Sequence, residues 1–246
     1  AGGPYPTTSY KQISDVDYFI LNEAEITLPS FIRDFEAGNP EHVYSTTEKP
    51  DISRTPVPRY DLLKIKKYNN LALQNSRGCP FNCEFCDIIE LFGRVPRLKT
   101  PTQFASELTA VYETGFRGSV FIVDDNFIGN RSKVISLLQE IIKWQKIHNN
   151  PFTFFTEASI NLAPDDEMLG LMNQAGFDMV FTGIETPDYA SLSGCHKTQN
   201  LKTDLLESVK KIQKKGIEVS AGFIVGFDTD KEDIFDRQIE FIQWRW

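Results

Sequence analysis

Three of the four cysteines of the chain lie close together, in the run RGCPFNCEFC. Cys79, Cys83 and Cys86 have the spacing C-x3-C-x2-C, and Phe85 directly precedes the last of them. Cysteines that only fill a core have no reason to cluster, whereas a short loop with three thiolates can bind an iron–sulfur cluster. Three thiolates on a four-iron cluster leave one iron open to another ligand, which indicates a catalytic site. The spacing therefore favours a metal site at these cysteines.

Two other uses of the three cysteines stay open at this point. A closed structural zinc site needs a fourth protein ligand, which Cys195 or His196 in SLSGCHKTQN would have to supply from more than a hundred residues away. A redox or structural group of cysteines is the other alternative. Disulfides fit least, because the spacings are short and nothing indicates secretion. Cys195 and His196 are more simply ordinary loop residues, since one Cys-His pair lacks the spacing of a site.

The motif C-x3-C-x-aromatic-C, in a loop after a hydrophobic strand, resembles the motif of the radical S-adenosylmethionine enzymes. In that family the three cysteines bind a [4Fe–4S] cluster, and its fourth iron chelates the amino and carboxylate groups of S-adenosylmethionine. Reductive cleavage of the sulfonium then yields a 5'-deoxyadenosyl radical that abstracts a hydrogen atom from the substrate. The resemblance implies that Cys79, Cys83 and Cys86 are the cluster ligands. It also implies an external one-electron reductant of the flavodoxin or ferredoxin type.

Composition narrows the class of protein. At 246 residues, with 41% hydrophobic and 24% charged residues, the chain has the length for one large domain plus part of another. The sequence has no apolar run long enough for a bilayer and no signal segment at its start, so we predict a cytoplasmic protein. A net charge of -8 argues against bulk binding of nucleic acid, which needs a basic face.

The ends of the sequence predict a piece of a longer protein. The chain opens AGGPYPTT without methionine and stops at FIQWRW within a predicted helix. Residues 16–21 predict a strand and residues 27–38 a helix that ends at Gly38, which is too little for a domain. Residues 39–70 contain prolines at positions 40, 50, 56 and 58 and predict a linker.

From residue 71 onward, apolar strands alternate with helices. The strands are LALQNS, GSVFIVDD, FTFFTEA, DMVFTGIE and EVSAGFIVGF, and the helices lie near 101–114, 131–147, 164–175, 201–215 and from about 230. This alternation predicts β/α units around a parallel sheet. Composition alone leaves a flavodoxin-like open sheet as an alternative. The family resemblance instead implies an α/β fold, a partial (β/α)6 TIM-type barrel over residues 71–246 that lacks its sixth unit.

Polar residues and glycines follow the predicted strands, at the edge where parallel β/α folds place their active sites. They are Asp124, Asp125, Asn126, Glu157, Glu185, Gly222, Ile224 and Gly226. Asp124 and Asp125 could ligate a divalent cation, act as an acid/base pair or cap a helix. In the family the corresponding loop often reads Gly-Gly-Glu and contacts the methionyl amino group of S-adenosylmethionine; here it reads VDDNF.

Two further motifs resemble contacts of S-adenosylmethionine in the family. Glu185 in GIETP resembles the residue that binds the ribose hydroxyls, although a carboxylate at a helix start is the alternative. Gly222, Ile224 and Gly226 in GFIVGFD resemble the G-x-I-x-G motif along the adenine, where glycine lets the backbone approach a flat ring. Glu157 is a further candidate at the end of its strand.

The front of the chain resembles a particular branch of the family. GGPYPTT and VDYFILNEAEITLPSFI resemble the tail of the Rossmann-like cobalamin-binding domain of B12-dependent radical enzymes, which predicts a remnant of that domain at residues 1–38. VDDNFIGN, TEASINLA, GIETP and GFIVGFD resemble the subgroup that contains hopanoid-associated enzymes. The resemblance implies methyl transfer or carbon-skeleton modification of a small-molecule or lipid substrate that the residues do not identify.

The same resemblance sets expectations for cofactors and alternatives. The signature D-x-H-x-x-G, whose histidine can ligate cobalt, is absent from the sequence, so we expect cobalamin in the full-length protein and not in this piece alone. Without the sixth unit we do not expect this piece alone to complete a turnover. The alternatives are an RNA methylthiotransferase relative, which the acidic balance disfavours, and a zinc-stabilised binding module.

Overall fold

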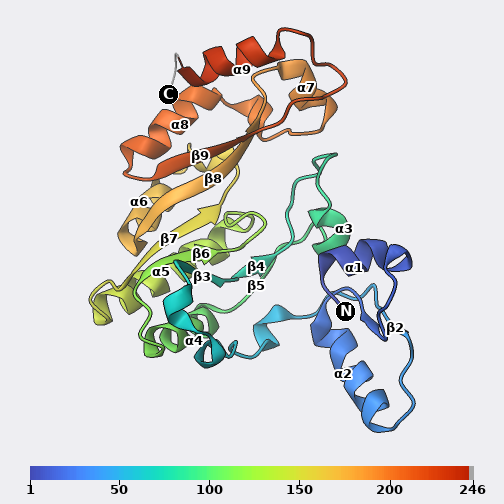
Figure 1. Ribbon diagram of the computed structural model, residues 1–246. Helices are drawn as coiled ribbons and strands as arrows, with labels where there is room; N and C mark the ends of the chain where they lie inside the picture. Colours follow the sequence, from blue (N-terminus) through green and yellow to red (C-terminus); the bar gives the residue numbers. More distant parts are fainter. Residues whose placement is uncertain (244–246) are drawn as a thin grey trace.

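A sheet of five parallel strands forms the centre of the computed structural model, which describes residues 1–243 (Figure 1). The strands are β3 (Asn70–Leu73), β6 (Gly118–Ile122), β7 (Phe152–Glu157), β8 (Phe177–Glu185) and β9 (Glu218–Phe223). Their order in the sheet is β3-β6-β7-β8-β9, so each strand lies beside the next in sequence. An open flavodoxin-like sheet would reverse its order partway. The partial TIM-type barrel predicted from the resemblance is therefore confirmed.

Helices follow the strands and cover the outer face of the sheet (Figure 1). They are α4 (Pro101–Glu113), α5 (Arg131–Ile147), α6 (Asp166–Ala175), α8 (Leu205–Lys214) and α9 (Ile234–Gln243), with the shorter α3 (Ile88–Phe92) and α7 (Tyr189–Gly194) in two of the loops. The boundaries of α4 and α5 agree with the predicted ranges to within one residue, whereas α9 starts later than predicted. Residues 244–246 of the predicted barrel lie outside the described residues.

Local sequence signals explain where these helices begin and end. The Thr100 side chain accepts a hydrogen bond from the backbone N–H of Gln103, and Pro101 fills the first helical position of α4. Asp165 caps α6 in the same way, by accepting from the N–H of Met168. Gly176 ends α6 in the left-handed conformation, with φ of 98°, which glycine adopts without a Cβ penalty.

Alternation along the strands divides the sheet into two faces. Val120, Ile122, Phe154 and Val180 point to the helices and are fully buried. Burying one such side chain stabilises the fold by about 1.5–3 kcal/mol. The residues between them face the other way, toward the inside of the barrel, and are only partly buried. The core therefore lies between sheet and helices, and the inner face stays available for a site.

Residues 1–44 form a small α/β unit beside the barrel (Figure 1). Its elements are α1 (Pro4–Ser9), β1 (Phe19–Ile20), α2 (Ala24–Glu36) and β2 (Val43–Tyr44). β1 and β2 pair in parallel, so the unit extends past residue 38 into the stretch predicted as a linker. The rest of that stretch has short 3-10 helices, and its Tyr60 is buried in the core of the barrel. That the unit is the remnant of a cobalamin-binding domain stays a prediction.

Buried ion pairs join this unit to the barrel. The short strands β4 (Ser76–Arg77) and β5 (Arg97–Leu98) pair antiparallel and frame the cysteine loop. Glu23, which is 4% exposed, accepts from Arg97 at 2.8 and 3.0 Å and from Arg77 at 2.8 Å. Glu25 accepts from Arg77 at 2.8 and 3.0 Å. The two arginines at the base of the cysteine loop are thus held by carboxylates of the N-terminal unit.

We expect Glu23→Ala to lower the free energy of unfolding by about 3–5 kcal/mol, because it leaves two largely buried arginines without this partner. Asp61→Ala is the matched control, since Asp61 pairs with Arg59 on the surface, where such a pair contributes about 0–1 kcal/mol. Urea unfolding measures both. Equal losses in the two variants would show that the Glu23 pairs do not hold the unit to the barrel.

Candidate functional site

The cysteine loop leaves the sheet through a tight turn at Gly78. Gly78 has φ of +96°, and a Cβ there would lie 2.8 Å from the carbonyl oxygen of Gly93, so glycine is required. The backbone N–H of Cys79 donates to that same carbonyl at 3.2 Å, and the N–H of Cys86 donates to Cys83 at 3.1 Å. None of the three cysteines forms a disulfide. The loop is thus folded on itself with its thiols free.

The three thiols open into a cavity of about 170 Å3 at the carboxyl ends of the barrel strands. Seven of the residues that line it were candidates from the sequence, namely Cys79, Cys83, Cys86, Asp125, Asn126, Glu157 and Glu185. The other eight lining residues were not, namely Phe81, Phe85, Ala158, Ser159, Phe181, Gly183, Lys197 and Gln199. The remaining candidates, Asp124, Gly222, Ile224 and Gly226, lie outside this lining. The strand-end rule therefore located the site but not all of its residues.

The thiols fit a cluster better than a single metal ion. In residues 1–243, no three His, Cys, Asp or Glu side chains meet at the spacing of one ion. A [4Fe–4S] cluster binds each thiolate on a different iron, so its ligands do not share one point. Burial raises the pKa of the Cys79 and Cys86 thiols, so iron must displace their protons on binding.

Cys195 and His196 do not complete a zinc site. Cys195 is buried, and its thiol donates to the carbonyl of Leu192 at 3.6 Å. His196 is exposed, and neither side chain lines the cavity. A closed zinc site would need a fourth ligand beside the three thiols. The donor set therefore matches three cysteines on an open cluster.

Both carboxylate oxygens of Asp124 accept hydrogen bonds inside the fold. One carboxylate oxygen accepts from the backbone N–H groups of Asn75 and Ser76 at 2.7 and 2.9 Å. The other accepts from their side chains at 3.0 and 2.7 Å. Asp124 is 1% exposed, and this burial raises its pKa to about 6 despite the four donors. Asp124 therefore anchors the backbone that leads into the cysteine loop and has no oxygen free for a ligand.

The next two residues do reach the cavity. Asp125 accepts from the backbone N–H of Gly78 at 2.7 Å, and burial raises the pKa of its carboxyl. The oxygen of the Asn126 side chain accepts from the N–H and the hydroxyl of Ser159, both at 3.2 Å. Its nitrogen consequently points toward the Cys79 sulfur, 3.9 Å away. The VDDNF segment thus contacts the cysteine loop at two places.

Glu185 ends β8 in an ion pair that the sequence did not reveal. Its carboxylate accepts from the Lys197 ammonium at 2.6 Å, and both side chains are largely buried. Glu185 has φ of +66°, and α7 starts four residues later with Asp188 as its cap, so Glu185 is not a helix-start carboxylate. A Cβ at Gly183 would lie 2.1 Å from the Glu185 oxygen, so glycine makes room for the pair.

Gly222 and Ile224 of GFIVGFD lie next to this pair, whereas the N–H of Gly226 donates to Asp230. Gly222 is opposite Gly183 in the sheet, and a Cβ there would lie 2.9 Å from the ring of Phe181. The N–H of Ile224 donates to the Glu185 carbonyl at 2.8 Å. Neither residue lines the cavity, yet both adjoin residues that do. Their contact with an adenine stays a prediction.

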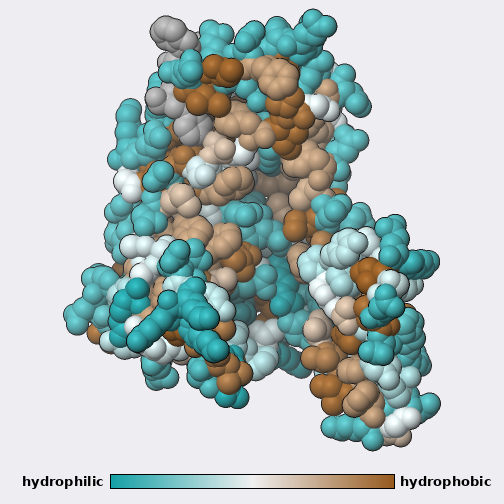
Figure 2. Space-filling view, in the orientation of Figure 1, coloured by the Kyte–Doolittle hydropathy of each residue, from teal (hydrophilic) through white to brown (hydrophobic). Residues whose placement is uncertain are grey.

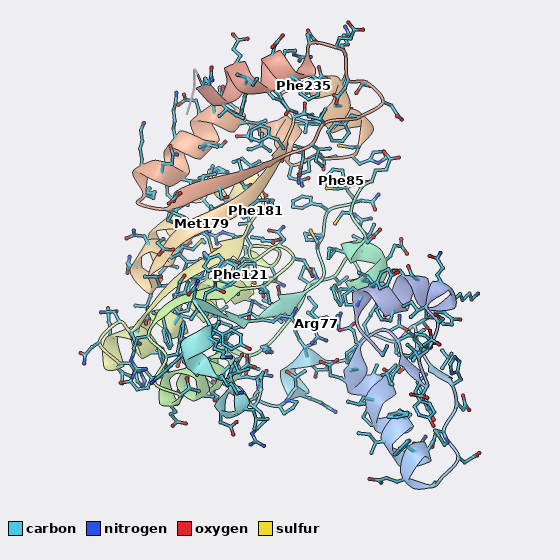
Figure 3. All side chains as sticks on the ribbon, viewed as in Figure 1. Arg77, Phe85, Phe121, Met179, Phe181 and Phe235 are labelled. Carbon is cyan, nitrogen blue, oxygen red and sulfur yellow. The ribbon has the colours of Figure 1, made fainter. Side chains whose placement is uncertain are left out.

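Apolar side chains form a row across the inner face of the sheet. Phe121, Phe155 and Met179 are direct neighbours on β6, β7 and β8. The first two rings stack with centroids 4.6 Å apart. Phe181 follows Met179 by two residues on β8, lines the cavity and is 41% exposed. Phe85 of the cysteine loop faces the same space (Figure 3). Figure 2 shows a hollow on this side of the molecule, bordered by apolar side chains.

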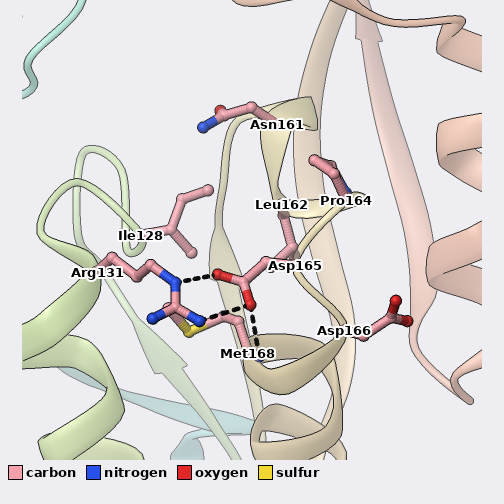
Figure 4. A pocket seen from close by; sticks show the side chains of 8 residues that line it. All are labelled: Ile128, Arg131, Asn161, Leu162, Pro164, Asp165, Asp166 and Met168. Carbon is pink, nitrogen blue, oxygen red and sulfur yellow. Dashed lines mark hydrogen bonds and ion pairs between the residues drawn. The ribbon is translucent and has the colours of Figure 1, made fainter.

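A second cavity, of about 450 Å3, lies between the starts of α5 and α6 (Figure 4). Its cation, Arg131, is paired with Asp165 and with Glu167. No cysteine lines this cavity, so we assign it no chemistry.

Among residues 1–243 no helix is long and apolar enough to cross a membrane.

A parallel β/α sheet with three free thiols at its carboxyl edge defines an iron–sulfur protein of the barrel type. The family model described as the Radical SAM superfamily matches residues 74–242, and the chain belongs to this family. Enzymes of the family use a [4Fe–4S] cluster and S-adenosylmethionine. The three cysteines, the open cavity beside them and a lining that contains no fourth cysteine and no histidine fit these cofactors.

Two relatives of this chain carry names of methyl-transferring enzymes. It is 50% identical, over 98% of its length and 46% of the relative, to an uncharacterized methyltransferase of Synechocystis. It is 39% identical to the hopanoid C-2 methylase of Rhodopseudomonas palustris, over 98% of this chain and 47% of that protein. The chain thus spans about half the length of these relatives.

A solved structure shows the same fold. The cobalamin-dependent S-adenosylmethionine radical enzyme OxsB, with aqua-cobalamin bound, superposes with a TM-score of 0.79 at 20% identity. The match covers 98% of this chain and 38% of OxsB. It therefore includes the N-terminal unit as well as the barrel strands.

We expect the stability of the wild type relative to Asp124→Asn to depend on pH, because the Asp124 carboxyl titrates and an amide does not. Because the pKa of Asp124 is raised from 3.8 to about 6, its protonation stabilises the folded state below about pH 4, and this contribution is lost as the pH rises through 6. The advantage of the wild type over Asp124→Asn should thus shrink between pH 4 and 7, by up to about 3 kcal/mol.

Urea unfolding at several pH values measures this, and the exposed Asp178→Asn is the control. If the advantage of the wild type instead stays constant between pH 4 and 7, the four donors outweigh burial and Asp124 is ionised throughout this range.

Proposed function

We propose that the protein is a radical S-adenosylmethionine enzyme that transfers a methyl group, with cobalamin in the full-length protein. Cys79, Cys83 and Cys86 would hold the [4Fe–4S] cluster. When bound, these cofactors supply a 5'-deoxyadenosyl radical by reductive cleavage of S-adenosylmethionine. The observation that supports the proposal most is the set of three free thiols, with no fourth cysteine or histidine in the lining, at the mouth of the strand-end cavity.

The lining suggests a role for each polar group. S-adenosylmethionine carries a sulfonium and an ammonium, and Asp125 and Glu157 are carboxylates beside the thiols. Glu185 has one oxygen on Lys197, which leaves the other to accept from ribose hydroxyls. Gly222 and Ile224 lie on the adjoining strand and segment, where an adenine could rest on backbone. Asp124 supports this arrangement without touching the cofactor.

The inner face suggests an apolar substrate. Phe121, Phe155 and Met179 offer a flat apolar surface one register step from the cavity. A relative at 39% identity is named for methylation of a hopanoid, a polycyclic lipid. A fused-ring lipid could place a ring carbon near the cavity while its body rests on the aromatic row. The reductant and the cytoplasmic location stay predictions.

Anaerobic reconstitution with iron and sulfide tests the cofactor assignment. We expect about four irons per chain and a four-iron electron paramagnetic resonance signal on reduction that changes when S-adenosylmethionine is added. Cys83→Ala should lose the signal, because it removes a cluster ligand. Cys195→Ala is the matched control and should keep it, since Cys195 lies outside the cavity lining. One zinc per chain and no cluster would contradict the proposal.

Labelled cofactor tests the substrate class. The full-length protein, given S-adenosylmethionine with a deuterated methyl group and a lipid extract, should transfer the label to a polycyclic lipid. We expect Phe155→Ala to raise KM at least about tenfold, because it removes apolar contact worth about 1.5–3 kcal/mol, while the cluster signal stays. Phe235→Ala, at an exposed site on α9, is the control. Label only in water-soluble products would exclude a lipid substrate.

A further inference from the structure

We propose that two buried amide side chains, Gln199 and Asn126, donate hydrogen bonds to cysteine sulfurs of the cluster and make the cluster easier to reduce. The proposal rests on the cofactor assignment above. It concerns residues that lie far from the cysteines in sequence and that the cysteine motif does not include.

Gln199 faces Cys83 from the far side of the cavity. Its amide nitrogen lies 3.6 Å from the Cys83 sulfur, and its side chain is buried. The oxygen of the same amide has no partner among the described residues. The opposite orientation would aim that oxygen at a thiolate, which places two acceptors face to face. The nitrogen therefore faces the sulfur, and the sulfur is its partner.

A short segment, residues 195–200, fixes Gln199 in this place. Asn200 donates to the carbonyls of Gly183 and Ile184, both at 3.0 Å, which ties the segment to β8. The Cys195 carbonyl accepts from the N–H of Glu84 at 3.0 Å, which ties it to the cysteine loop. Segment 195–200 thus joins the end of β8 to the cysteine loop, with Gln199 between them.

Asn126 is the counterpart on the other side. Ser159 donates twice to its oxygen, so its nitrogen is left to face the Cys79 sulfur at 3.9 Å. Asn126 is 3% exposed, so no bulk water competes for that N–H. Two of the three cysteine sulfurs therefore each have an amide donor from a different loop.

The effect on the cluster follows from charge. Adding an electron makes the cluster and its thiolates more negative, so a donor N–H stabilises the reduced form more than the oxidised form. Hydrogen bonds to the sulfurs are among the factors that set cluster potentials. Removing an N–H donor should lower the reduction potential of the cluster, which makes reduction by the external electron donor harder.

Potentiometric titration with dithionite, monitored by electron paramagnetic resonance, tests the proposal. One electron enters each cluster, and no bond forms or breaks. We expect Gln199→Met, which keeps the length but lacks the N–H, to lower the ratio of reduced to oxidised cluster at a fixed potential about tenfold, or about 59 mV for one electron. Asn126→Asp keeps the acceptor for Ser159 but loses the donor, and should also lower the ratio. Gln213→Met, exposed on α8, should not.

Exchangeable-proton couplings separate a hydrogen bond from packing. The reduced wild-type cluster should show a deuterium coupling after transfer to D2O that Gln199→Met lacks and Gln213→Met keeps. A fully loaded Gln199→Met with unchanged potential and unchanged coupling would overturn the proposal. If Gln199→Met loads no cluster, Asn126→Asp decides by the same two readouts. A wild type without a four-iron signal would contradict the cofactor assignment itself.

Discussion

The site depends on two consecutive carboxylates that hold the backbone just before Cys79. Asp124 accepts from four donors of Asn75 and Ser76, and Asp125 accepts from the N–H of Gly78. Between them they fix the segment that leaves β3 and turns into the cysteine loop. A cluster loop has no regular secondary structure of its own, so it needs such anchors to keep its thiols on the sheet edge. The predicted strand-end acids thus serve the site partly by holding its backbone.

The same loop is restrained from two further sides. The arginines at its base, Arg77 and Arg97, pair with Glu23 and Glu25 of the N-terminal unit. Across the cavity, segment 195–200 contacts the loop through the carbonyl of Cys195 and the side chain of Gln199. Elements far apart in sequence therefore determine how the thiols lie. A displacement of the N-terminal unit would shift the cysteine loop through these ion pairs.

Periodicity and caps were enough to predict the barrel strands and most helices, because strands buried on one side and capped helices have local signatures. The cysteine motif predicted the proposed cluster ligands, and the strand-end rule predicted Asp125, Asn126, Glu157 and Glu185, which line the same cavity. Lys197 and Gln199 were not predictable, since both lie in a loop that reaches the cysteines only through tertiary folding. Asp124 was predicted to contact a cofactor together with Asp125. The two residues have the same type and are adjacent in sequence, and only the fold shows that Asp124 is the one buried against Asn75 and Ser76.

The charges around the cavity favour a cationic ligand. Asp125, Glu157 and Glu185 face it with only Lys197 as a lining cation, and Lys197 already pairs with Glu185. Loss of solvent raises the pKa of Glu157, and the Asp125 charge raises it further. Asp125 and Glu157 form no ion pair among the described residues, and their burial beside three thiols costs free energy that a bound cation would offset. S-adenosylmethionine, with its sulfonium and ammonium, would supply such a cation, and an anionic nucleotide of similar shape would not, so the charge of the lining supports the proposed cofactor.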